Sequence, residues 1–133
     1  MKIKAILGSL MMLIVLGSCK YEESGLSLRT KKSRVTNSWY KDAIELENGK
    51  VEKIGKSDSD TWEFTKDGDF FVYDVSSTDV FSYKWEFANS KKELKITDPV
   101  DGETFNFEIL KLKKDEMWLK DIEFKDVLRL KPS

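Results

Sequence analysis

From Trp39 onward, large apolar residues recur at every second position, with charged or small residues between them. Such alternation is typical of strands that have one buried face and one solvated face. The pattern therefore predicts antiparallel β-structure and leaves little room for helix. The clearest runs are Trp62 and Phe64; Phe71, Tyr73 and Val75; Phe81, Tyr83, Trp85 and Phe87; Leu94 and Ile96; and Phe105, Phe107 and Ile109.

Residues that favour tight turns separate these runs at hairpin spacing. They are Asn48-Gly49, Asp67-Gly68, the segment 89–92 and Asp101-Gly102. Asn-Gly and Asp-Gly are favoured because tight hairpin turns need a positive φ at their central residues. The sequence thus predicts about eight antiparallel strands in meander order, followed by a final run near 126–131. The approximate spans are 38–46, 50–54, 60–66, 69–76, 79–88, 93–98, 103–113 and 116–122.

A meander this long must protect its two edges, and closure into a barrel removes them. The apolar phase slips by one residue at Ile109-Leu110, which predicts a β-bulge where the strand bends around the closing sheet. We therefore expect an all-β, up-and-down antiparallel barrel of about eight strands. A barrel of that size is just wide enough to be filled by side chains or to hold one small ligand.

The N-terminus resembles a bacterial export signal. Lys2 and Lys4 precede an apolar stretch over 5–16, which is long enough for a signal peptide and shorter than the roughly 20 residues that span a bilayer. An uncleaved anchor or a buried helix is the alternative. The stretch ends in Leu16, Gly17, Ser18 and Cys19, which match the lipobox that directs acylation of the cysteine and cleavage before it.

We therefore predict a lipoprotein signal peptide at 1–18, an acylated Cys19 and a polar tether over 19–37, and a globular domain at 38–133. Stable anchoring needs at least two acyl chains, which lipobox processing would supply. The second half of the tether leaves room for a short basic helix. Lys20 with Glu22 and Glu23 resembles the signal that sends Bacteroidota lipoproteins to the outer face of the outer membrane; a solvated spacer is the alternative. The expected location is the cell envelope.

Several short motifs, in their order and spacing, resemble the lipocalin-like domain of Bacteroidota lipoproteins. The resemblance covers nearly all of the chain after the signal. It implies a calyx-type β-barrel with a small hydrophobic ligand as a candidate, and no established chemistry. The motifs are Ser38-Trp39-Tyr40, Asn48-Gly49-Lys50, the segments 62–68, 83–87, 109–112 and 116–119, and the final 128–132.

Composition argues against catalysis, a bound metal or cofactor, and nucleic acid. The chain has no histidine and its only cysteine is assigned to the anchor, so the commonest general base and a thiol nucleophile are both missing. The acidic segments 58–60 and 98–103 lack the ligand spacing of an EF-hand, and we interpret them as solvated turns. Residues 1–18 contain two of the 23 basic residues and none of the 24 acidic ones, so the remaining chain carries a formal charge of −3. Phosphate binding favours a cationic excess instead.

The aromatic residues carry the functional hypothesis. Eight of them fall on alternate positions and are predicted to point to one side, where they either fill the barrel or line a ligand cavity. Two functions follow: a lipid-anchored module that binds a small apolar molecule, or a solid-cored structural protein that contacts a protein or glycan partner. The eight residues are Trp62, Phe64, Phe71, Tyr73, Tyr83, Trp85, Phe105 and Phe107.

Overall fold

The computed structural model of the protein describes residues 30–133. The predicted signal peptide, the lipobox with Cys19 and most of the predicted tether lie outside these residues. One compact unit runs from Lys31 to Ser133. In the described part of the chain, no helix is long and apolar enough to cross a membrane. The elements are α1 (Lys31–Val35), β2 (Asn37–Glu45), β3 (Val51–Lys53), the 3₁₀ turn η1 (Lys56–Asp58), β4 (Thr61–Phe64), β5 (Asp69–Tyr73), β6 (Val80–Ala88), β7 (Glu93–Thr97), β8 (Thr104–Lys113), β9 (Glu116–Asp121) and β10 (Val127–Pro132).

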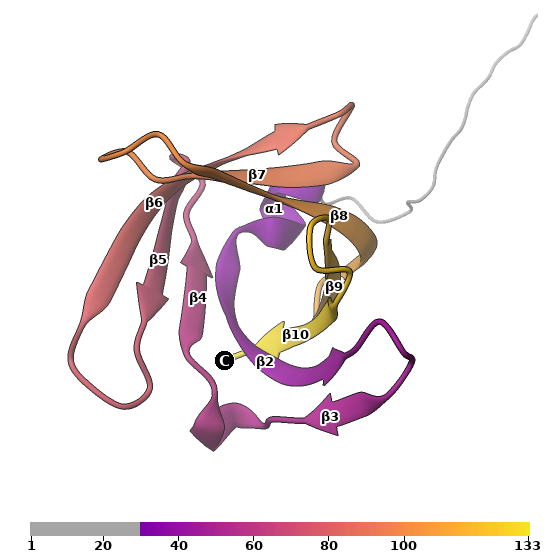
Figure 1. The fold of residues 1–133 in the computed structure, drawn as a ribbon. Helices are drawn as coiled ribbons and strands as arrows, with labels where there is room; N and C mark the ends of the chain where they lie inside the picture. Colours follow the sequence, from indigo (N-terminus) through magenta and orange to yellow (C-terminus); the bar gives the residue numbers. More distant parts are fainter. Residues whose placement is uncertain (1–29) are drawn as a thin grey trace, which may run out of the picture. The chain divides into compact units, whose positions relative to one another are not determined.

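Eight antiparallel strands form a closed barrel, as the sequence predicted. Strands β4 to β10 follow one another around the barrel, and β2 closes it by pairing with β10 on one side and β4 on the other (Figure 1). The short strand β3 is an extra, ninth strand. It pairs with the second half of β2, beyond the four residues of β2 that pair with β4. Closure removes the two free edges that an open meander would have.

The strand that follows β2 is interrupted, and a buried serine bridges the interruption. Between β3 and β4 the chain leaves the ladder through η1, so Lys41 of β2 has no backbone partner there. The Lys41 amide donates instead to the hydroxyl of Ser59 at 2.7 Å, and that hydroxyl donates to the carbonyl of Asp60 at 2.7 Å. Ser59 is only 5% exposed. Its side chain therefore satisfies a backbone group that would otherwise be buried without a partner.

The predicted turns and bulge are present. Gly49 and Gly68 adopt φ values of +90° and +92°, which the hairpin turns require. The β8–β9 register shifts between Ile109 and Lys111, where the slip in apolar phase predicted a bulge. A second shift, which the sequence did not reveal, occurs in the β2–β10 pair beside Arg129. These irregularities increase local twist and help a short meander to close.

Helix α1 belongs to the barrel rather than to a tether. Val35 is fully buried, and its carbonyl accepts a 3.0 Å hydrogen bond from Nε1 of the fully buried Trp39. Arg34 donates to the carbonyl of Leu112 in β8 at 3.4 Å. The short basic helix expected before the first strand is thus present, but the compact unit begins at Lys31, earlier than the boundary at residue 38 that we predicted.

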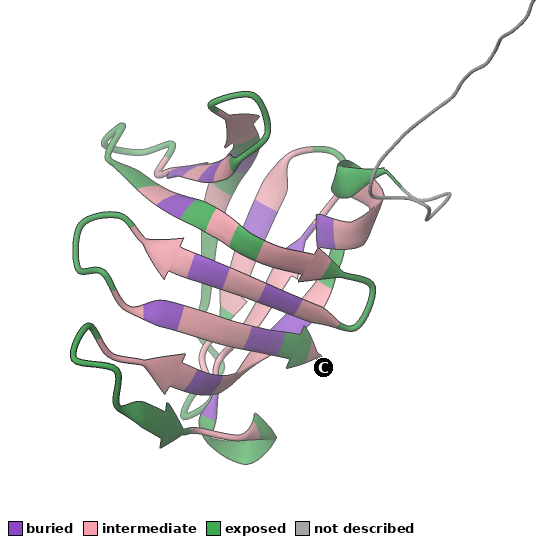
Figure 2. Cartoon of the chain, turned by 90° about the vertical axis from the view of Figure 1, so that its right-hand side faces the viewer, coloured by how far each residue is buried: buried purple, intermediate pink, exposed green. Residues whose placement is uncertain are grey.

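Buried and partly exposed residues alternate along the strands (Figure 2). Burial of each large side chain contributes about 1.5–3 kcal/mol relative to exposure. The resulting core lies inside the barrel and carries the stability of a domain that has no disulfide in its described part. The fully buried side chains are Val35, Trp39, Phe64, Leu94, Met117, Leu119 and Leu130.

Candidate functional site at the open end of the barrel

The two ends of the barrel carry different segments, because successive strands run in opposite directions. The helix end consists of α1 and the turns at 65–68, 89–92 and 113–115. The open end consists of the loops at 46–50, 74–79, 98–103 and 122–126. The predicted site residues are distributed unequally between these ends.

Toward the helix end, aromatic rings pack tightly. Phe64 stacks on Phe70 with ring centroids 4.5 Å apart, and Trp85 meets Phe64 edge-on at 5.6 Å. Nε1 of Trp85 donates to the carbonyl of Thr65 at 2.8 Å. Phe64 is 1% exposed and Trp85 5% exposed. Two of the predicted cavity residues are therefore part of the solid core.

Halfway along the axis, two rings meet across the barrel. Trp62 belongs to β4 and Phe107 to β8, which lie opposite one another with three strands between them in either direction. Their ring centroids are nevertheless only 6.0 Å apart. Side chains thus fill the barrel at this level, and the interior is not a deep open calyx.

Above that level, toward the open end, inward-facing aromatic residues are exposed. Phe81 pairs with Val72, which pairs with Trp62, so all three share the inner face. Phe105 pairs with the buried Ile96 and shares that face too. Yet Phe81 is 47% exposed and Phe105 41% exposed. We call this set of inward-facing apolar residues at the open end, Trp62, Val72, Phe81 and Phe105, the open-end cup.

A single cationic side chain projects toward the floor of the open-end cup. Nζ of Lys41 lies 5.2 Å from the ring centroid of Trp62, a cation–π distance. None of the ion pairs among residues 30–133 includes Lys41. The cup therefore combines apolar walls with one ammonium group, which is a donor for an acceptor oxygen on a bound molecule.

The prediction that all eight aromatic residues face one side is wrong for Phe71 and Tyr73. In β5 the inward residues are Phe70 and Val72, so Phe71 and Tyr73 lie on the outer face. The sequence 70–73 is apolar at every position, and alternation alone does not fix which pair is inside. Hairpin register would have done so, because pairing across the Asp67-Gly68 turn sets Phe64 opposite Phe70. Of the eight, Trp62, Tyr83 and Phe105 face inward and are at least partly exposed, and Phe107 is buried.

A second hollow lies beside the cup in the barrel wall. Thr104 and Phe105 at the start of β8 pair only with β7, because the β8–β9 ladder begins at Phe107 and its last neighbouring bond runs from the Ile122 amide to the Asn106 carbonyl at 3.3 Å. The gap that results has a volume of about 210 Å³ and shares Phe105 with the cup. No group of histidine, cysteine and acidic side chains within residues 30–133 is arranged to hold a metal ion. The gap is lined by Thr104, Phe105, Asn106, Asp121, Ile122 and Glu123.

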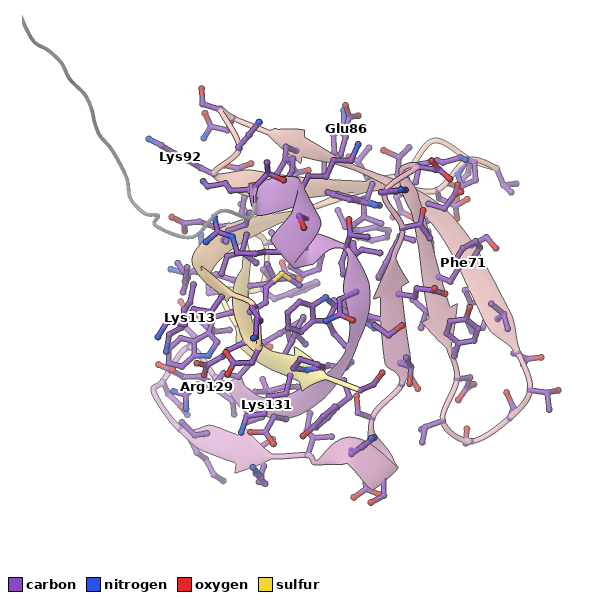
Figure 3. All side chains as sticks on the ribbon, turned by 180° about the vertical axis from the view of Figure 1, so that it is seen from behind. Phe71, Glu86, Lys92, Lys113, Arg129 and Lys131 are labelled. Atoms are coloured by element: carbon purple, nitrogen blue, oxygen red, sulfur yellow. The ribbon has the colours of Figure 1, made fainter. Side chains whose placement is uncertain are left out.

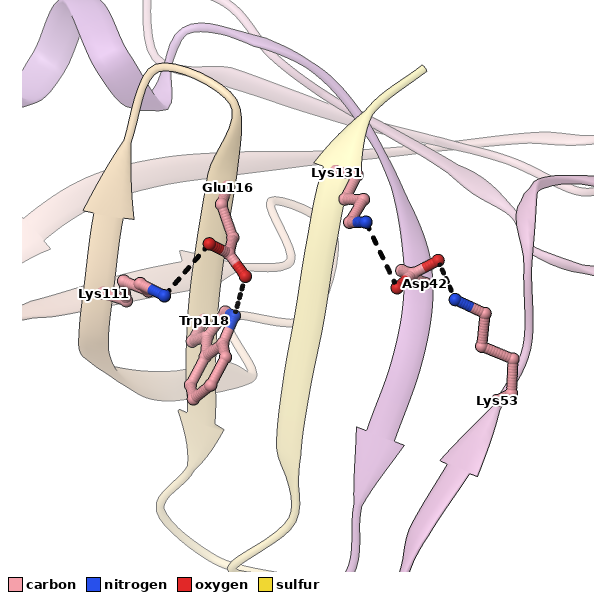
Figure 4. A network of polar contacts seen from close by, with 6 residues as sticks. All are labelled: Asp42, Lys53, Lys111, Glu116, Trp118 and Lys131. Atoms are coloured by element: carbon pink, nitrogen blue, oxygen red, sulfur yellow. Dashed lines mark hydrogen bonds and ion pairs between the residues drawn. The ribbon is translucent and has the colours of Figure 1, made fainter.

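Two polar networks lie on the outer face and join neighbouring strands (Figure 4). Asp42 accepts a 2.7 Å hydrogen bond from Lys53 and lies 3.7 Å from Lys131. The hydrogen bond from Lys53 holds the pKa of Asp42 below its usual range, and the charge of Lys131 adds to this effect. Glu116 likewise pairs with Lys111 at 3.0 Å, and this hydrogen bond lowers the pKa of Glu116. These contacts stabilise strand pairs and do not face the cup.

Comparison with solved structures finds a protein with a similar architecture. The chain superposes on a lipocalin-like protein from Bacteroides uniformis with a TM-score of 0.59, over 75% of this chain and 99% of that one, at 14% sequence identity. The fold is lipocalin-like. At this identity the likeness concerns the fold alone, and it confirms the fold expected from the sequence. Neither the family models nor the curated proteins contain a match to this sequence.

Within the lipocalin-like barrel, most of the aromatic side chains serve the core. The helix end and the middle are filled, whereas inward-facing apolar residues are exposed at the open end. Sequence reasoning missed Phe81 and Lys41 as cup residues. Phe81 alternates with Tyr83 and Trp85, so the same alternation could have placed it on the inner face. Lys41 follows Trp39 at the same spacing, but a charged residue at an inward position gives no such signal.

Proposed function

We propose that the protein is a lipid-anchored protein of the cell envelope whose barrel binds a small hydrophobic ligand in the open-end cup. The observation that carries this proposal is the exposure of Phe81 and Phe105, at 47% and 41%, on the inner face of a barrel. A ligand that covers an exposed apolar ring would be stabilised by about 25 cal/mol for each Å² of apolar surface removed from water. Concave apolar surfaces with a few polar groups are the usual form of small-molecule sites.

The cup suits a ligand that is only partly enclosed. Because Trp62 and Phe107 meet at 6.0 Å, the ligand would rest on Trp62 rather than enter the barrel fully. Lys41 would meet a carboxylate or another acceptor group on that ligand. We therefore propose an apolar molecule with one acceptor group, and no catalytic role.

Native mass spectrometry on a fragment that begins at Leu26 tests ligand binding. This fragment contains the whole compact unit and lacks the acylation site. A stoichiometric extra mass that disappears on denaturation is the expected result. Titration with dodecanoic acid, dodecanol and dodecylamine, followed by tryptophan fluorescence, would then rank the acid first.

Matched variants locate the site. Phe81→Ser and Phe105→Ser should weaken dodecanoic acid binding about tenfold each, since each removes most of an apolar ring from the interface. Phe71→Ser is the control, because Phe71 lies on the outer face of the same sheet. A fragment that stays free of ligand and binds none of the three probes would contradict the proposal.

The anchor is tested separately. Cys19→Ala in the full chain should move the protein from the membrane fraction to the soluble fraction, because acylation requires the thiol. Ser24→Ala, which alters no lipobox residue, should leave the protein with the membranes. Retention of the Cys19→Ala protein in the membrane fraction would refute the lipobox assignment. Protease treatment of intact cells would then distinguish a surface-exposed protein from one on the periplasmic side of the outer membrane.

A second candidate function is that of a structural lipoprotein that contacts a protein or glycan partner. Two observations favour it: the filled interior at Trp62, and apolar loop tips at the open end, where Val100 is 93% exposed and Phe124 66% exposed. Large apolar residues exposed at the loops of one end are candidates for an interaction surface. Absence of ligand in both mass and fluorescence experiments would favour this candidate.

A further inference from the structure

The two ends of the barrel carry opposite charge. The helix end, taken as segments 31–35, 65–68, 89–92 and 113–115, contains eight basic and two acidic residues. The open end, taken as loops 46–50, 74–79, 98–103 and 122–126, contains eight acidic and two basic residues. A nine-residue strand such as β6 is about 30 Å long, which exceeds the roughly 8 Å screening length of physiological salt. The two ends therefore act as separate electrostatic surfaces.

The cations of the helix end are held on one surface by hydrogen bonds. Nζ of Lys31 donates to the carbonyl of Lys91 at 3.0 Å, which ties α1 to the 89–92 turn. The amide of Ile109 in β8 donates to the carbonyl of Lys92 at 2.8 Å, and Arg34 ties α1 to β8. These contacts bring together three basic segments that are far apart in the sequence.

Seven lysines of this surface are exposed, and none of the six ion pairs among residues 30–133 includes any of them. Figure 3 shows two of them, Lys92 and Lys113, projecting from the ribbon into solvent. Their charge is thus available to an external anionic partner. We call this surface the basic surface; its exposed lysines are Lys31, Lys32, Lys66, Lys91, Lys92, Lys113 and Lys114.

We propose that the basic surface docks on an anionic bilayer, so that the open-end cup faces away from the membrane. Clustered lysines bind anionic headgroups, each charge near the surface strengthening binding about fivefold. The acidic open end would be repelled from the same headgroups, which gives the docked barrel one orientation. Docking on a bilayer is separate from ligand binding. It depends on the proposed anchor only because the anchor would keep the domain close to the membrane.

The path of the chain supports a membrane as the partner. The described chain begins at the helix end, at the start of α1. If Cys19 is acylated, residues 20–30 link it to α1 and reach at most about 40 Å when fully extended. The anchor would therefore be attached at the basic end, from which the basic surface reaches the headgroups without the tether running along the barrel. A tethered surface of this kind binds as if its partner were present at millimolar concentration.

The test uses residues 20–133, because the acyl chains of the full protein would bind any vesicle. Sedimentation with phosphatidylcholine vesicles should recover little protein, and vesicles that also contain phosphatidylglycerol should recover much more at low salt. Raising the salt concentration should release the protein, since the attraction is screened. Failure of the wild-type fragment to prefer anionic vesicles would overturn the proposal.

Two charge-matched variants locate the binding surface. The first neutralises four lysines of the basic surface and should weaken vesicle binding at least about tenfold. The second neutralises four lysines elsewhere, changes the net charge equally, and should weaken binding by about twofold or less. The first carries Lys32→Gln, Lys91→Gln, Lys92→Gln and Lys114→Gln; the second carries Lys50→Gln, Lys56→Gln, Lys120→Gln and Lys125→Gln.

Other outcomes are equally decisive. Equal losses in the two variants would mean that net charge alone matters, and would refute a defined docking surface. Tighter binding to a single-stranded oligonucleotide than to anionic vesicles would replace the bilayer with nucleic acid as the partner. Neither result would affect the proposed anchor or ligand, because fractionation of Cys19→Ala at high salt, which screens these lysines, and native mass spectrometry do not depend on them.

Discussion

A double-mutant cycle on Trp62 and Phe107 tests whether the middle of the barrel is filled. The two ring centroids are 6.0 Å apart and the ring planes are inclined by 59°, within the range of attractive aromatic pairs. Such pairs contribute about 0.5–1.5 kcal/mol beyond their area burial. We therefore expect Trp62→Leu and Phe107→Leu to destabilise the protein less in combination than the sum of the single effects, by about 1 kcal/mol.

The assay is equilibrium unfolding in urea, followed by far-ultraviolet circular dichroism so that loss of a tryptophan does not remove the signal. The control cycle pairs Phe107→Leu with Trp118→Leu. Trp118 alternates with the fully buried Met117 and Leu119, so it lies on the outer face and should be uncoupled from Phe107. A coupling below about 0.3 kcal/mol for Trp62 and Phe107 would refute the contact. The barrel would then be open at this level and would admit a ligand more deeply than we propose.

Three further predictions concern stability and titration. Trp39→Phe should lower the free energy of unfolding by about 2 kcal/mol more than Trp118→Phe in urea unfolding, because it removes the hydrogen bond to α1 and leaves a buried gap. Asp42→Asn should cost about 1 kcal/mol or less at pH 6. The pKa of Asp42 is lower in the folded protein than in the unfolded chain, where it is near 4. The loss of stability caused by Asp42→Asn should therefore be complete above the unfolded-state pKa and should vanish as the pH falls through the folded-state pKa. An unchanged loss of stability at pH 2 would contradict the pairing. The hydrogen bond to Glu63 raises the pKa of Tyr73, so Glu63→Gln should lower it in an ultraviolet titration, and no change would show that the bond is absent in solution.

Local sequence patterns were sufficient for the strands and turns of this protein. Period-two alternation, hairpin residues and a one-residue slip in phase are local signals, and they predicted the nine runs, the closed barrel and the bulge near Ile109. The sequence did not predict which residues of β5 point inward, because four successive apolar residues are compatible with either alternation. The sequence did not predict the break between β3 and β4, because the break depends on the side chain of Ser59 replacing a backbone partner of β2.

The filling of the barrel was beyond sequence reasoning for a different reason. Whether Trp62 reaches Phe107 depends on side chains from opposite walls, and no local pattern reports a cross-barrel distance. The same pattern of eight aromatic residues is compatible with a plugged or an open interior. Only their division into core residues, cup residues and outer-face residues decides what a ligand can reach.

Net charge was the least informative property of the sequence, and the topology explains why. The full chain has a formal charge of only −1, which suggests no preference for any charged partner. In an up-and-down barrel, however, successive turns alternate between the two ends. Acidic residues in one set of turns and basic residues in the other therefore separate in space while they cancel in the sum. Net charge describes the whole molecule, whereas binding of an anionic partner, nucleic acid included, depends on the local field at one end. For meander barrels, charge is better counted separately over alternate turns, and in this chain that count distinguishes the basic helix end from the acidic open end.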